Sequence, residues 1–169
     1  MSESEETARP VEILLVEDNP GDMRLTKEAL KEGKVYNNLH WANDGVEALA
    51  FLRREGKYSA APAPDIILLD LNLPKKDGRE VLLAVKSDDR LKHIPVVILT
   101  TSKAEEDVLR SYELHANCYI SKPVDLEKFI FVVKSIDRFW LSVVTLPPAA
   151  ARIACPAAVS HSLVCPRRA

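Results

Sequence analysis

The sequence has few cysteines, few aromatic residues and no long apolar run. Its three cysteines are an odd number without CxxC spacing, so neither a disulfide framework nor a strong zinc motif is indicated. No uninterrupted apolar stretch reaches the roughly 20 residues of a membrane span, and residues 2–6 lack the basic and apolar regions of a signal peptide. We therefore expect a cytoplasmic protein that does not enter a membrane.

Clustered basic residues are also missing. The chain carries 23 Lys and Arg against 25 Asp and Glu. Three of the bases, Arg152, Arg167 and Arg168, lie in residues 149–169, which hold no acid, so residues 1–148 have a net charge of −5. Binding to a phosphate backbone calls for clustered Lys and Arg, so this balance argues against nucleic acid as the main partner.

Short apolar runs alternate with helical patterns along residues 11–141. Five runs are predicted strands: 11–16, one within 35–42, 65–69, 95–99 and about 117–121. Apolar residues recur at helical spacing after each run, including 22–32, 103–115 and the segment that Asp125 caps. Because right-handed crossovers connect parallel strands, the pattern predicts an α/β doubly wound five-stranded parallel sheet of the flavodoxin-like kind, with strand order 2-1-3-4-5.

The flanking segments differ in composition. Residues 1–10 are expected to be a disordered N-terminus, and residues 142–169 a C-terminal extension that is disordered after 148, where periodicity stops. Cys155 and Cys165 lie near His161 in that extension, but three candidate ligands are a weak match to a zinc site. Cys118 falls in a predicted strand, which favours a buried inert thiol.

Four of the apolar runs end in residues that can bind a cation or a phosphate. Glu17 and Asp18 follow the first run, Asp70 follows the third, Thr100 closes the fourth and Lys122 follows the fifth. The carboxyl ends of parallel strands form one edge of the sheet, so these residues are predicted to share one crevice. The strand order places the first and third strands side by side, which brings the carboxylates together.

This combination fits the chemistry of an aspartyl phosphate. Clustered carboxylates repel one another unless a cation binds or one is protonated, and oxygen ligands open to water favour Mg²⁺. Asp70 suits a nucleophile toward phosphorus, Glu17 and Asp18 a metal site, and Lys122 a phosphate counter-charge. Each residue alone has an ordinary explanation, such as a helix cap or a solvated charge. Their joint placement at strand ends favours the functional interpretation.

Four segments, ILLVEDNPGD, ILLDLNLPKKDG, IPVVILTTS and CYISKPVDLEKF, resemble the receiver domain of two-component response regulators over about residues 11–141. The resemblance implies that Asp70 is the phosphoacceptor and that Glu17, which replaces the more frequent Asp, forms the acidic pair with Asp18. It implies no enzymatic activity beyond self-phosphorylation and slow autodephosphorylation. It also assigns supporting roles: the Asn72 backbone carbonyl to Mg²⁺, Thr100 as switch hydroxyl, Tyr119 as switch aromatic, Lys122 to the phosphate, and Pro123 as a structural proline after a cis peptide bond.

A narrower likeness is carried by FLRREGKY, LNLPKKDGREVL, SKAEEDVLRSYELHANCYISKPVDL and FWLSVVTLPP, which resemble single-domain regulators paired with phytochrome-type histidine kinases. It implies a sensor histidine kinase as partner and a role in light signalling. A homodimer is also expected, through apolar side chains of the fourth helix, fifth strand and fifth helix: Val108, Tyr112, Phe129, Phe131 and Val132. The alternative is that Phe131 packs on the chain's own Phe139 and Trp140.

Three other classes fit less well. A phosphohydrolase of the haloacid-dehalogenase-like group requires D-x-D after its first strand, whereas Asp70 follows the third and precedes Leu71 and Asn72. A degenerate receiver that only binds partners would not need the acceptor Asp70, nor Asp18, Thr100 and Lys122, all of which this sequence retains. A DNA-binding regulator is disfavoured because the about 29 residues after Trp140 cannot hold a winged-helix or helix-turn-helix domain. Output is expected through protein contacts or through relay of the phosphoryl group.

Overall fold

The computed structural model describes residues 9–33 and 35–147. The expectations for residues 1–8 and for 148–169, including the candidate zinc ligands, fall outside this range. Within it, no helix is both long and apolar enough to cross a membrane.

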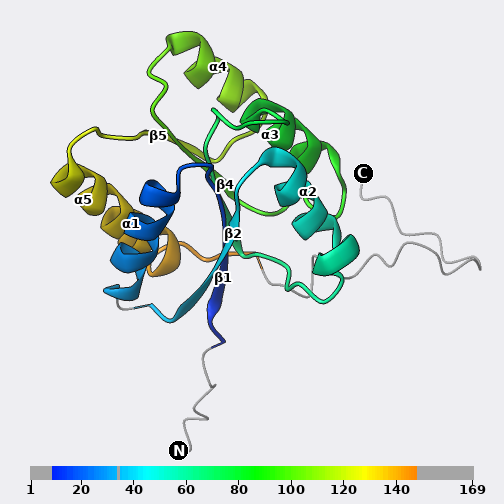
Figure 1. The fold of residues 1–169 in the computed structure, drawn as a ribbon, viewed down its shortest axis with the longest axis horizontal. Coiled ribbons are helices and arrows are strands. Elements are labelled where there is room, and N and C mark those ends of the chain that lie inside the picture. The colour runs from blue at the N-terminus through cyan, green and yellow to red at the C-terminus, as the bar shows by residue number, and fades with distance from the viewer. Residues whose placement is uncertain (1–8, 34, 148–169) are drawn as a thin grey trace, which may run out of the picture.

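The architecture is the predicted α/β doubly wound sheet (Figure 1). Its strands are parallel and lie in the order β2-β1-β3-β4-β5. They are β1 (Val11–Val16), β2 (Asn37–Ala42), β3 (Ile66–Leu69), β4 (Val96–Thr100) and β5 (Cys118–Ser121). The helices are α1 (Pro20–Lys31), α2 (Gly45–Arg53), α3 (Gly78–Ser87), α4 (Glu105–Glu113) and α5 (Leu126–Ile136), with a 3₁₀ turn η1 (Gly56–Tyr58) and a π-helical turn η2 (Asp137–Leu141).

Polar caps start most of the helices directly after the strands. The side chains of Asn19, Asp44 and Asp125 accept backbone N–H bonds at the N-termini of α1, α2 and α5. Asp77 and Glu80 form a reciprocal capping box at α3. These caps satisfy N–H groups that have no partner within the helix and so fix the residue at which each of these four helices begins.

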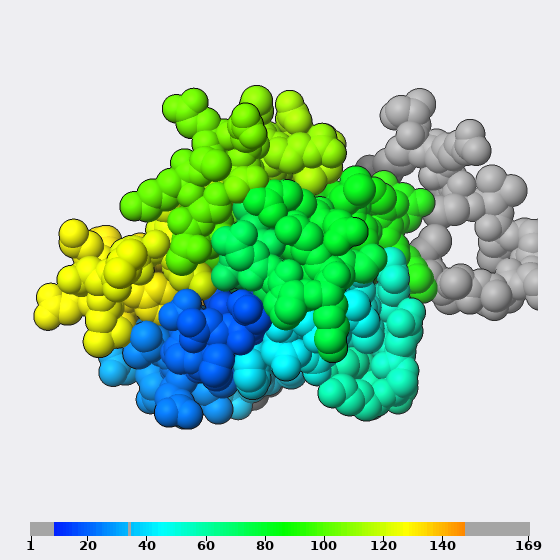
Figure 2. All heavy atoms as spheres, turned by 45° about the horizontal axis from the view of Figure 1, so that its top comes forward, coloured from blue at the N-terminus to red at the C-terminus, as the bar shows by residue number. Residues whose placement is uncertain are grey.

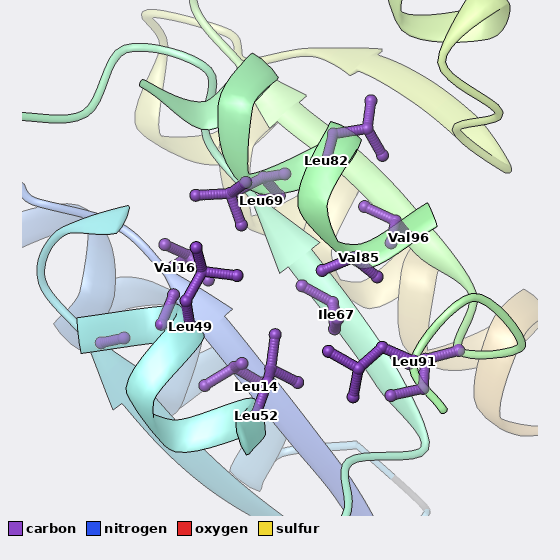
Figure 3. Close-up of a cluster of buried hydrophobic side chains, with 14 of the residues drawn as sticks. Leu14, Val16, Leu49, Leu52, Ile67, Leu69, Leu82, Val85, Leu91 and Val96 are labelled. Carbon is purple, nitrogen blue, oxygen red and sulfur yellow. The ribbon is translucent and has the colours of Figure 1, made fainter. Parts of the chain in front are cut away.

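The central strands β1, β3 and β4 are buried on both faces, which explains why they read as continuous apolar runs. Alternate strand residues enter two separate cores. In one, Leu14, Val16, Ile67 and Leu69 pack under α2 and α3, as Figure 3 shows. In the other, on the opposite face, strand residues pack with α1 and α5, which lie together in Figure 1.

Strand pairing aligns the functional ends of the sheet. Val16 pairs with Leu69, so Glu17 and Asp70 leave β1 and β3 at the same level, and Thr100 pairs with Ser121 beside Lys122. In Figure 2, the dark-blue segment after β1 lies between the yellow segment that precedes α5 and the green segment that follows β3. Segments far apart in sequence therefore meet at one edge.

One expectation about side-chain burial, that for Cys118, was wrong, and α4 leaves apolar side chains exposed. Leu109 and Tyr112 of α4 are exposed, whereas Ser111 and, at the C-cap, Leu114 are buried. Helix α4 lies at the periphery of the sheet (Figure 1), where it contacts β5 and, through the ion pair of Arg79 with Asp107, α3. Cys118 is half-buried rather than fully buried, and burial raises the pKa of its thiol.

Candidate functional site

Asp70 lies immediately after β3 and is 5% exposed. One carboxylate oxygen, Oδ1, accepts hydrogen bonds from the Asn72 N–H at 3.0 Å and from the Thr100 hydroxyl at 2.9 Å. The other, Oδ2, accepts from the Lys122 ammonium at 3.0 Å. A buried carboxylate with this set of donors is positioned by residues from β3, β4 and the end of β5.

The Lys122 ammonium is buried and contacts three carboxylates. Its Nζ donates to Asp70 Oδ2 and to Asp22 Oδ2, each at 3.0 Å, and to Glu17 Oε2. Burial alone would lower the pKa of Lys122, but the hydrogen bonds with Glu17 and Asp22 and the nearby charges of Glu17 and Asp70 raise it well above its ordinary value. Lys122 is therefore a charged ammonium throughout the physiological pH range.

Glu17 and Asp18 differ in environment although they are adjacent. Glu17 is buried, with Oε1 accepting the Asn19 N–H at 3.0 Å and Oε2 accepting from Lys122. Burial raises the pKa of the Glu17 carboxyl to about 7, against the opposing effects of Lys122 and the Asn19 N–H. Asp18 is exposed at the mouth of the site. The acidic pair thus consists of one internal and one solvent-facing carboxylate.

Glu17, Asp18 and Asp70 offer one carboxylate oxygen each within 4.8 Å of one another. Three hard oxygen donors, one of them open to water, suit a small divalent cation that keeps part of its hydration shell. Carboxylates held this close repel one another, and a bound cation would relieve that repulsion. The residues present therefore fit a divalent cation.

Two residues in the site were not predicted. Asp22, in the first turn of α1, begins the predicted helical segment 22–32 and was given no role in the site, yet its carboxylate reaches Lys122. Trp41, near the end of β2, donates its indole N–H to the Glu17 backbone carbonyl at 2.7 Å and is 40% exposed. Asp22 follows the end of β1 by six residues and Trp41 stands next to the last residue of β2, so the only signal in the sequence was their nearness to a strand end.

The structure leaves the predicted role of Asn72 untested and corrects the prediction for Pro123. Asn72 is exposed and uses its backbone N–H toward Asp70, whereas the role of its carbonyl toward a cation stays a prediction. The expectation of a cis bond before Pro123 was wrong, because no cis peptide bond occurs among the described residues. The two X–Pro isomers differ intrinsically by only about 0.5–1 kcal/mol, so the sequence alone does not decide between them. The trans form here has the Lys122 N–H donating to the Thr100 carbonyl at 2.6 Å.

A polar network extends from Thr100 toward α4. The Ser102 N–H lies 3.4 Å from Thr100 Oγ1, and the Tyr119 hydroxyl donates to the Ser102 carbonyl at 2.9 Å. The Ser102 hydroxyl donates to Asp107 Oδ2 at 2.5 Å, and Arg79 donates to Asp107 Oδ1 at 2.9 and 2.5 Å. The predicted switch pair Thr100 and Tyr119 is therefore joined through the β4–α4 loop, which α3 also holds.

These features define a class of protein: a doubly wound α/β domain with a buried aspartate between a carboxylate cluster and a lysine, as an aspartyl-phosphate acceptor requires. The sequence model of the response regulator receiver domain matches residues 13–134, and the chain therefore belongs to this family. It is a phosphoryl-accepting receiver of two-component signalling.

Comparison with known proteins places the chain near cyanobacterial regulators. It is 52% identical over 146 residues to response regulator Rcp1 of Synechocystis sp., which covers 86% of this chain and 99% of that protein. The crystal structure of the Mn²⁺-bound form of Rcp1 matches with a TM-score of 0.80 over 82% of this chain and 100% of the other, at 52% identity. The structure of the phosphorylated cyanobacterial phytochrome response regulator RcpA matches with a TM-score of 0.81 over 83% and 100%, at 54% identity.

Proposed function

We propose that Asp70 is the residue that accepts the phosphoryl group. The observation that carries this proposal is the placement of its buried carboxylate between the Lys122 ammonium, the Thr100 hydroxyl and the cluster of Glu17 and Asp18. A carboxylate oxygen of Asp70 attacks phosphorus, a P–O bond forms, and the bond to the donor breaks with its electron pair leaving on the donor. The chain's own chemistry is confined to gaining and losing this group.

The surrounding residues have distinct tasks in this reaction. Lys122 supplies a fixed positive charge beside the reacting oxygen, and Thr100 supplies a hydroxyl that can turn from Asp70 to a phosphoryl oxygen. Glu17, Asp18, Asp70 and the Asn72 carbonyl would hold the cation, for which we propose Mg²⁺. When bound, it neutralises charge between the carboxylates and the phosphoryl oxygens.

Intact-mass measurement after incubation with acetyl phosphate and Mg²⁺ tests the assignment. The wild-type chain should gain one phosphoryl group, and Asp70→Asn should gain none. Asp89→Asn, which removes a carboxylate that is almost fully exposed on a loop, is the matched control and should be labelled like the wild type. Full labelling of Asp70→Asn at another residue would refute the assignment.

We further propose that the phosphoryl donor is a sensor histidine kinase of the phytochrome type, in the cytoplasm, and that the chain acts in light signalling. Support comes from the high identity to Rcp1 across nearly its full length, and from the likeness to RcpA and to the bacteriophytochrome response regulator AtBRR, 47% identical with a TM-score of 0.64. Transfer of ³²P from a phosphorylated phytochrome-type kinase should be faster than transfer from an unrelated histidine kinase. Equal rates would contradict the pathway assignment.

We also propose a homodimer through α4, β5 and α5. Of the residues predicted for this face, Tyr112 and Phe131 are exposed, Val108 and Val132 are half-buried, and Phe129 is buried in the core and so does not belong to it. Leu109 is exposed beside them, and Phe131 is 71% exposed rather than packed on Phe139 and Trp140, which contact each other. Light scattering at tens of micromolar protein should report a dimer that Phe131→Glu disrupts. Tyr36→Glu, at an equally exposed aromatic residue before β2, should leave it intact. A monomeric wild type, with and without beryllofluoride, would reject the dimer.

A further inference from the structure

Asp22 adds a fourth carboxylate to the site. It stands in the first turn of α1, outside the cluster formed by Glu17, Asp18 and Asp70. Its Oδ2 lies 3.0 Å from Lys122 Nζ, a contact between residues 100 positions apart, and its side chain is 29% exposed. A single lysine thus faces several acidic groups, and Asp22 is the one that belongs neither to the acceptor nor to the cation cluster.

The ammonium of Lys122 has three N–H groups, and three carboxylates accept from it. A phosphoryl group on Asp70 brings oxygens that need the same cation. Glu17 can turn toward a bound divalent ion, because it lies in the cluster that fits one. Asp22 lies outside that cluster and so has no bound cation to turn toward. Its carboxylate therefore competes with the phosphoryl oxygens for the Lys122 ammonium.

Helix capping does not account for the Asp22 side chain. The N-cap of α1 is Asn19, whose Oδ1 already accepts from the Gly21 and Asp22 N–H groups. A carboxylate in the first turn also gains a little from the helix dipole, but any orientation toward solvent would serve that purpose. The observed orientation, toward a buried lysine, points to the reaction site.

We propose that Asp22 is a positioning residue that draws the Lys122 ammonium toward α1 and so weakens the hold of the site on a phosphoryl group at Asp70. This inference rests on the proposed role of Asp70 as acceptor. Removing the charge of Asp22 should let the ammonium follow the phosphoryl oxygens and should lessen repulsion of an anionic donor. The chain would thereby limit how strongly its phosphorylated form is stabilised.

The test compares Asp22→Asn with two controls. Asp22→Glu keeps the charge and should restore the behaviour of the wild type. Glu28→Gln removes an exposed charge from the same helix, away from the site. Calorimetry at saturating Mg²⁺ measures beryllofluoride affinity, and intact mass measures the initial rate of labelling by acetyl phosphate. Small donors are used so that a change in kinase docking does not enter.

Asp22→Asn should bind beryllofluoride and accept phosphoryl groups roughly three- to ten-fold better than the wild type, the scale of one partly solvated charge at this range. The gain should shrink in about 0.5 M salt, which a merely structural effect would not do. Glu28→Gln should match the wild type. Unchanged or weaker binding by Asp22→Asn, even with a lowered melting temperature, would overturn the proposal, as would an equal gain in Glu28→Gln.

Failure of this inference can be told apart from failure of the proposed function. If the wild type and Glu28→Gln are labelled on Asp70 while Asp22→Asn behaves in the same way, only the role of Asp22 is lost. If the wild type takes no phosphoryl group, the assignment of Asp70 is lost and this inference with it.

Discussion

Thr100 donates its hydroxyl hydrogen to Oδ1 of Asp70 at 2.9 Å, and both side chains are buried. The hydroxyl is therefore engaged with the acceptor before any phosphoryl group is present. If the hydroxyl turns to a phosphoryl oxygen, as we propose, it would disturb Ser102, whose N–H faces the same hydroxyl and whose carbonyl accepts from Tyr119. The two packings would then differ in population according to phosphorylation.

The first prediction concerns this hydroxyl. Thr100→Val removes it at nearly constant shape, whereas Thr100→Ser keeps it. Because Lys122 and the acidic cluster remain, both variants should still be labelled on Asp70. Beryllofluoride should change the NMR shifts of Tyr119 and α4 in wild type and Thr100→Ser, and much less in Thr100→Val. A wild-type shift pattern in Thr100→Val would contradict the coupling.

The second prediction separates the two acidic neighbours. Glu17 is buried with both oxygens already bonded, while Asp18 faces solvent, so Asp18 can give an oxygen directly to a hydrated cation. Asp18→Asn should weaken Mg²⁺ binding by at least about ten-fold, and Glu17→Gln by a smaller factor. Calorimetric titration measures both, with Glu28→Gln as control. The reverse order, or labelling that persists in EDTA, would disprove the assignment.

The positions that sequence predicted well are those where local pattern and topology agree. Strands buried on both faces read as unbroken apolar runs, and a parallel sheet brings their carboxyl ends together, so Glu17, Asp70 and Lys122 could be placed in one crevice. The alternation of elements predicted a doubly wound sheet, and the strand order was taken from the common arrangement of five such units, which the structure confirms.

What could not be predicted depends on side-chain direction. Two contacts illustrate this: Asp22 with Lys122, and the Tyr119 hydroxyl with the Ser102 carbonyl. Each joins two segments whose relative position in the fold is set by tertiary packing, which the local sequence pattern does not give. Helical periodicity identified an apolar side of α4, but it gives no information on whether another element covers that side. In the structure Leu109 on this side is exposed, which the sequence pattern could not predict.

The third prediction concerns pH and the ion pair that ties α3 to α4. The Arg79 guanidinium, together with the Ser102 hydroxyl, holds the pKa of Asp107 below its ordinary value. A carboxylate with a lowered folded-state pKa stabilises the fold above its unfolded pKa of about 3.9, and that contribution is lost as pH falls through the lower folded value. Asp107→Asn should therefore be less stable than the wild type by about 1 kcal/mol at pH 7.

Urea unfolding from pH 7 down to pH 3 measures this difference, which should narrow as Asp107 becomes protonated in the wild type. Glu106→Gln, at an exposed acid in the same turn of α4, should show no comparable loss. A difference that stays constant down to pH 3 would mean that the charge of Asp107 is not its cause.

The last prediction links backbone packing to the acceptor. A Cβ on Gly78 would lie 2.2 Å from the Asp70 carbonyl oxygen and 2.6 Å from Leu71 Cα, and both are backbone atoms that cannot move away alone. Gly78→Ala should therefore displace the loop that carries Asp70, lower stability by about 2–3 kcal/mol and slow labelling by acetyl phosphate.

Gly56→Ala is the control: no atom lies within 4 Å of the Cβ that the substitution adds, but the φ of +55° at Gly56 disfavours alanine. It should lose about 1 kcal/mol and keep wild-type labelling, because strain at Gly56 does not reach Asp70. Denaturant unfolding measures the stability of both variants, and intact mass measures their labelling at a temperature where both are folded. A Gly78→Ala variant with wild-type stability and labelling would show that the loop can accommodate the Cβ without moving Asp70.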